Sequence, residues 1–72
     1  MKRFIMDESK ETLINIDHIE HFYLHDRGEG CGSGPRYQIK AETENHEFII
    51  MSAHNEEFCK EQLKGIQDYL NS

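Results

Sequence analysis

Apolar and polar residues alternate along most of this chain with the two-residue period of β-strands. The clearest case is residues 36–51, which alternate on both sides of a polar tip at 43–46. Such a pattern predicts two antiparallel strands joined by a short turn. The core face of this hairpin is expected to carry Tyr37, Ile39, Phe48 and Ile50.

Near the end of the chain the period changes to that of a helix. Four apolar residues follow one another at spacings of four, three and four: Cys59, Leu63, Ile66 and Leu70. This stripe predicts an amphipathic helix from about 55 to 70. Ser52 and Asn55 are candidate N-caps, and the two glutamates at 56 and 57 suit the positive end of the helix dipole. The polar residues assigned to solvent are Lys60, Glu61, Lys64, Gln67 and Asp68.

Earlier in the chain, three further strands are predicted. The apolar runs 4–6 and 12–16 are separated by a polar turn, and a bend follows at 17–18. From Glu20 the alternation restarts, with Phe22 and Leu24 on one face. The opposite face of that strand carries His21, Tyr23 and His25. Residues 27–35 hold four of the five glycines and the only proline, which predicts a flexible loop.

These elements predict an α+β fold in one domain spanning 1–72. We expect a bent antiparallel β-meander of four or five strands, forming a partial barrel, with the C-terminal helix packed across one side. A chain of 72 residues buries only about 60% of its unfolded surface, so its core is thin. A thin core suits a marginal monomer or a chain that shares stability with a partner, such as a homodimer.

The order of these segments resembles a known family. A strand and polar turn lead into Glu11-Thr-Leu-Ile-Asn-Ile-Asp-His-Ile-Glu-His-Phe, and Ile49-Ile-Met-Ser precedes a glutamate-rich helix start. This arrangement is similar to the small FlbD-type flagellar proteins and to short relatives from Gram-positive bacteria and their phages. The similarity covers most of the chain outside 27–35. It implies a compact β-meander with a C-terminal helix and a role through protein contacts, with no catalytic residues to carry over.

Charge narrows the classes of partner. Fourteen acidic residues against eight basic ones give a formal charge of −6, which repels phosphate backbones and anionic lipid heads. We therefore expect no direct nucleic-acid binding and no membrane binding. The absence of an apolar leader or spanning run favours a cytoplasmic location with reduced thiols. An alternative is that the carboxylates imitate phosphates, as in an acidic inhibitor from a phage or mobile element that occupies a nucleic-acid groove.

Histidine and cysteine raise a metal-binding alternative. The candidate ligands are His18, His21, His25 and Cys31, because imidazole and thiolate bind zinc and copper. The three histidines would share a face if 18–25 were helical. On the strand we expect, His21 and His25 lie about 13 Å apart. The leading expectation is therefore no metal and no other cofactor.

No set of residues predicts catalysis. Cys31 with His25 would need a pocket that holds the thiolate, and a loop of four glycines offers no such pre-organisation. The sequence thus predicts a small non-enzymatic protein-interaction module, an adaptor or inhibitor of a larger assembly. Its predicted contact residues are His21, Tyr23 and His25 on the strand and Gly30, Cys31 and Gly32 in the loop.

Overall fold

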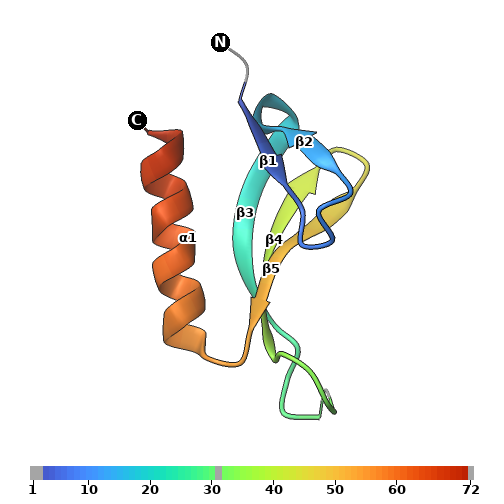
Figure 1. Ribbon diagram of the computed structural model, residues 1–72, viewed down its shortest axis with the longest axis vertical. Coiled ribbons are helices and arrows are strands. Elements are labelled where there is room, and N and C mark those ends of the chain that lie inside the picture. Colours follow the sequence, from blue (N-terminus) through green and yellow to red (C-terminus); the bar gives the residue numbers. More distant parts are fainter. Residues whose placement is uncertain (1–2, 31, 72) are drawn as a thin grey trace.

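A computed structural model of the chain describes residues 3–30 and 32–71 (Figure 1). Its elements follow in the order β1 (Phe4–Met6), β2 (Leu13–Asn15), the 3-10 helix η1 (Ile16–His18), β3 (Ile19–Asp26), β4 (Tyr37–Thr43), β5 (Glu47–Ala53) and α1 (Glu56–Leu70). The predicted α+β class, with antiparallel strands and one C-terminal helix, is confirmed. No helix in the described ranges has the length and apolar character needed to cross a membrane.

The strands form two sheets, so the expected single meander of four or five strands is not confirmed, and they do not close a barrel. β1 pairs with β2, and the second sheet has the order β3-β4-β5. The division occurs at η1, where the Asn15 side chain accepts a hydrogen bond from the Asp17 backbone N–H at 3.0 Å. This local bond begins a turn and redirects the chain between the two sheets.

The β1–β2 hairpin meets the larger sheet at β5. The Glu8 backbone N–H donates to the Ile49 carbonyl at 2.8 Å, and the Ser52 hydroxyl donates to the Glu8 carboxylate. Both partners of Glu8 belong to β5, so the hairpin turn covers part of that strand. The other edge of the three-stranded sheet is β3.

The core lies on the face of the larger sheet that α1 covers. β4 supplies Ile39 and Ala41, which are fully buried. Ala41 lies opposite Phe48, but a register shift follows, and Ile39 lies opposite Met51. The expectation that Ile50 pairs on this face was therefore wrong, because the β-bulge inserts one residue and Met51 takes the position.

Helix α1 is fixed at both ends. The Asn55 side chain accepts a hydrogen bond from the Phe58 N–H at 3.1 Å, which makes Asn55 the N-cap rather than Ser52. At the other end, the Arg3 guanidinium donates to the carbonyls of Tyr69 and Leu70, at 2.9 and 3.1 Å. Arg3 thereby joins the start of β1 to the end of α1, which lie at the same end of the molecule (Figure 1).

Candidate functional site

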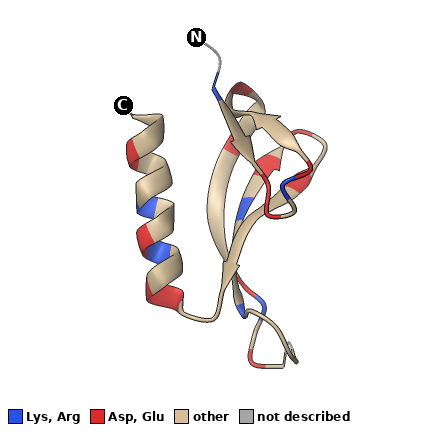
Figure 2. Ribbon diagram, viewed as in Figure 1, with Lys and Arg blue, Asp and Glu red and all other residues tan. Residues whose placement is uncertain are grey.

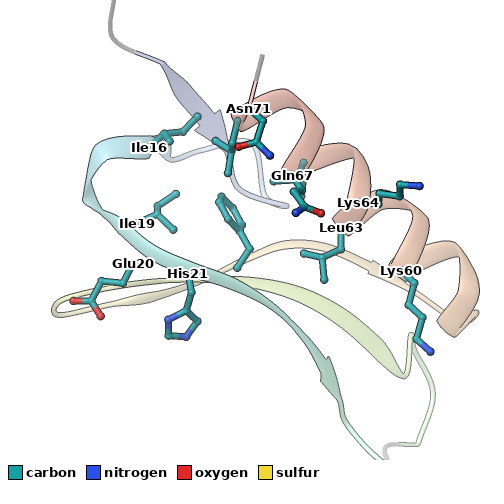
Figure 3. A pocket seen from close by; sticks show the side chains of 12 residues that line it. Ile16, Ile19, Glu20, His21, Lys60, Leu63, Lys64, Gln67 and Asn71 are labelled. Atoms are coloured by element: carbon teal, nitrogen blue, oxygen red, sulfur yellow. The ribbon is translucent and has the colours of Figure 1, made fainter.

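A groove of about 700 Å³ opens between α1 and the segment formed by η1 and β3 (Figure 3). Its apolar lining consists of Ile16, Ile19, Phe22, Leu63, Ile66 and Leu70. Its polar lining consists of Glu20, His21, Lys60, Lys64, Gln67 and Asn71. In Figure 3, Ile16 and Ile19 on one side and Leu63 on the other point toward the same space, while His21 points away from it. We call this feature the groove.

The groove exists because the sheet covers the helix stripe unevenly. Cys59, in the first turns of α1, has no exposed surface, and its burial raises the pKa of the thiol. Leu63, Ile66 and Leu70 belong to the same stripe but are only half-buried. The later part of the stripe therefore faces the groove rather than a closed core.

The strand that borders the groove is an open edge. Within residues 3–30 and 32–71, β3 pairs only with β4. Every second residue of an edge strand directs its N–H and C=O groups away from the sheet. From His21 to Asp26 the pairing is regular, without the bulges, prolines or lysines that commonly protect edges. Ile19 to Phe22 of β3 line the groove, and a register shift lies between Ile19 and His21, so the regular open edge meets the groove at His21 and Phe22 and continues beyond it.

Two lysines of α1 line the helical side of the groove, and their surroundings differ. The Lys60 Nζ lies 2.9 Å from a Glu56 oxygen and 3.9 Å from a Glu57 oxygen. The bond from Lys60 lowers the pKa of the Glu56 carboxyl. Lys64 makes no ion pair with any described residue. Figure 2 shows these two basic positions between acidic ones along α1. Lys64 lies between Glu61 and Asp68 along the helix without forming an ion pair with either, so its ammonium group is available to a carboxylate that enters the groove.

The predicted strand residues lie together on the face of the larger sheet that points away from α1, which we call the outer face. His21, Tyr23 and His25 lie opposite residues 42, 40 and 38 of β4, respectively. The His21 ring nitrogen is 3.4 Å from a Glu42 carboxylate oxygen. Only His21 of the three also borders the groove. Contact of these residues with a partner stays a prediction.

Tyr23 has a partner within the chain. Its hydroxyl donates to the Glu47 carboxylate, which also accepts a bond from the Lys40 ammonium at 3.0 Å. The bond to Glu47 raises the pKa of Tyr23 to about 12. The same bond, together with Lys40, lowers the pKa of Glu47. The outer face therefore carries a connected polar network across its three strands.

The glycine-rich loop lies apart from the groove. Gly30 and Gly32 are exposed, and Cys31 lies outside the described residues. The loop base is closed by Arg36, whose guanidinium donates to both Asp26 carboxylate oxygens at 2.7 and 3.0 Å and lowers the pKa of that carboxyl. None of the described loop residues lines the groove. Its flexibility and its partner contacts stay predictions.

The histidines proposed as metal ligands are distributed over two elements. His18 lies in η1, whereas His21 and His25 lie in β3, so the strand assignment for this segment is confirmed. Among the described residues, no three histidine, cysteine or acidic side chains come together in a way that could hold a metal ion. The fourth candidate, Cys31, lies outside those residues.

Sequence reasoning missed the groove. It assigned Lys60, Lys64 and Gln67 to solvent, and all three are exposed, but it did not predict that they also line a groove beside the apolar stripe. The available signal was the length of that stripe, because its later residues need apolar neighbours that a short sheet does not supply. Ile16 and Ile19, three residues apart across η1, supply only part of that cover.

Comparisons of the chain with protein-family models, with curated proteins and with solved structures gave no match. The resemblance to FlbD-type proteins therefore stays a prediction, and the function must be argued from the groove.

Proposed function

We propose that this protein is a small protein-interaction module that binds its partner through the groove, as an adaptor or inhibitor of a larger assembly. The supporting observation is the combination of half-buried apolar side chains on both sides of the groove with an open strand edge beside them. Contiguous apolar surface of this kind marks interaction sites, because water-exposed apolar area is unfavourable until a partner covers it.

The lining residues favour binding over catalysis. Of the described residues that form the groove, none is a serine, threonine or cysteine that His21 could activate as a nucleophile. Glu20 and His21 are adjacent acid–base groups at the groove. The His21 side chain, however, points away from the groove and lies near Glu42 on the outer face. The groove supplies apolar area, backbone groups and a lysine, which are the components of a peptide-binding surface.

A matched pair of tryptophan substitutions on α1 tests this function. Gln67→Trp places a large side chain in the groove, whereas Gln62→Trp makes the same change on α1 outside the groove lining. Random dodecamer peptides displayed on phage are selected on the unmodified protein, and the affinities of the enriched peptides are measured for all three forms.

We expect the enriched peptides to lose at least about tenfold in affinity for Gln67→Trp, equivalent to about 1.4 kcal/mol, and to bind Gln62→Trp unchanged. Failure to enrich any peptide, or equal binding to both variants, would contradict the proposal. Circular dichroism of each variant confirms that the helix is retained.

A further inference from the structure

The two elements beside the groove are long enough to accommodate an extended segment of chain. β3 has eight residues and spans about 26 Å at about 3.3 Å per residue. α1 has 15 residues and spans about 22 Å at about 1.5 Å per residue. A strand added to β3 would lie about 4.8 Å from it and would border the groove beside Ile19 to Phe22. Its alternate side chains would point toward the helix side and contact residues such as Phe22 and Leu63.

The backbone of β3 provides the directional part of this recognition. Its outward N–H and C=O groups have no partner strand within the described residues. An extended peptide satisfies them by forming a ladder, and pockets for alternate side chains then select its sequence. A helical ligand would fill the apolar space but would leave this edge unpaired, so the open edge favours an extended ligand.

The charges beside the groove indicate which charged side chain the bound segment should carry. Lys60 is already compensated by Glu56, but Lys64 has no ion pair among the described residues. A single carboxylate on the helix side of the added strand would meet Lys64. The chain carries a formal charge of −6, which disfavours strongly acidic segments at long range. The complementary segment is therefore largely apolar, with one side-chain carboxylate.

A second copy of the chain fits less well. Two β3 strands paired about a two-fold axis would place the middle of one α1 toward the middle of the other. Each copy carries a formal charge of −6, and the repulsion between two such chains opposes a dimer of this kind.

We infer that the groove binds an extended segment of a partner protein, which adds to the sheet beside β3, directs alternate apolar side chains toward α1, and presents one aspartate or glutamate carboxylate to Lys64. This inference rests on the proposed function and specifies its ligand. A partner of this kind is recognised by its conformation and by one charge.

Synthetic octapeptides test the inference. Each is acetylated and amidated at its ends, with valine at four alternate positions and threonine between them. Each valine is replaced in turn by glutamate, and a matched set carries lysine instead. Binding is followed by ¹⁵N NMR titration of the protein. The variants are Lys64→Glu and Lys64→Gln, with Lys10→Glu in the β1–β2 turn as a control of equal charge change.

We expect one glutamate peptide to bind about fivefold more tightly than its lysine counterpart, the size of a favourable exposed ion pair of about 1 kcal/mol. Lys64→Glu reverses this preference, Lys64→Gln abolishes it, and Lys10→Glu leaves it unchanged. N-methylation of one alternate set of peptide amides abolishes binding, while N-methylation of the other set is tolerated, because only one set faces β3.

Three results would overturn the inference: no octapeptide binds, both methylated sets bind equally, or Lys64→Glu leaves the preference unchanged. Native mass spectrometry of the free protein could give a fourth such result: a dimer that is lost in Gln67→Trp would mean that a second copy of the chain occupies the groove. If phage-selected peptides depend on Gln67 but are helical or lack a carboxylate, the inference is wrong and the proposed function stands. If selected peptides are insensitive to Gln67→Trp, both are wrong.

Discussion

We expect Arg3 to make the main stabilising contact between the smaller sheet and the end of α1. Its guanidinium makes two hydrogen bonds to helix carbonyls and lies 5.5 Å from the Tyr69 ring centre. The last turn of α1 has no basic residue of its own, so Arg3 is the cation at the negative end of the helix dipole. Because Leu70 and Asn71 line the groove, Arg3 also fixes one end of it.

The magnitude follows from these contacts. A net hydrogen bond contributes about 0.5–1.5 kcal/mol, and an exposed cation–π contact about 0.5 kcal/mol. One of the two bonds is exposed and the other partly buried, so values near the lower limits apply. We expect Arg3→Gln to lower the free energy of unfolding by about 1.5 kcal/mol. In a domain of this size, that corresponds to a decrease in Tm of about 6–12 °C.

Urea denaturation and thermal melts measure the effect. Lys10→Gln removes the same charge from an exposed turn and is expected to change stability by less than about 0.5 kcal/mol. Arg3→Lys keeps the charge but not the two-pronged geometry and is expected to fall between them. Amide exchange at residues 67–71 should accelerate in Arg3→Gln. Equal stabilities of Arg3→Gln and Lys10→Gln would refute the role assigned to Arg3.

Three further predictions concern single side chains. Asn55→Ala should lower stability by about 1 kcal/mol in urea denaturation through loss of the N-cap bond, while Asn55→Asp should retain it; equal losses would contradict the cap. Because the pKa of Glu47 is lowered, its stabilising contribution is present above the ordinary glutamate pKa and is lost as pH falls through the pKa of the folded state. In Tyr23→Phe, NMR titration should show a Glu47 pKa closer to the ordinary value. An unchanged Glu47 pKa would exclude the bond from Tyr23. In a Cys31→Ser background, the buried Cys59 thiol should react with iodoacetamide only slowly until urea unfolds the chain, and rapid reaction of the native protein would contradict its burial.

Sequence reasoning succeeded where structure is determined locally. The hairpin tip at 43–46 follows from adjacent alternating strands, and the β4–β5 turn occurs there. The start of α1 follows from Asn55 and the two acidic residues after it, because capping involves groups only three residues apart. The buried position of Cys59 followed from the period of the helix stripe.

Features that depend on contacts distant in sequence could not be predicted. The division into two sheets depends on η1 and on the bond between Glu8 and Ile49, which are 41 residues apart by their numbering. The register shift after Ile39 exchanges Ile50 for Met51 without any glycine or proline to mark it.

The groove was not predictable for a related reason. Lys64 and Gln67 have the polarity of solvent-facing helix positions, and only the placement of α1 relative to β3 makes them lining residues. The outer-face residues His21, Tyr23 and His25 were placed correctly relative to one another, because a strand fixes which side chains share a face. Which surface binds a partner is a separate question that the strand period does not answer.

The most direct test of the binding account is hydrogen exchange of β3 in the presence of the best-binding glutamate octapeptide. The account predicts that alternate amides between His21 and Asp26, those not bonded to β4, become protected on binding, together with shifts at Leu63 and Lys64. Protection confined to β5, to the outer face or to the 27–35 loop would contradict it.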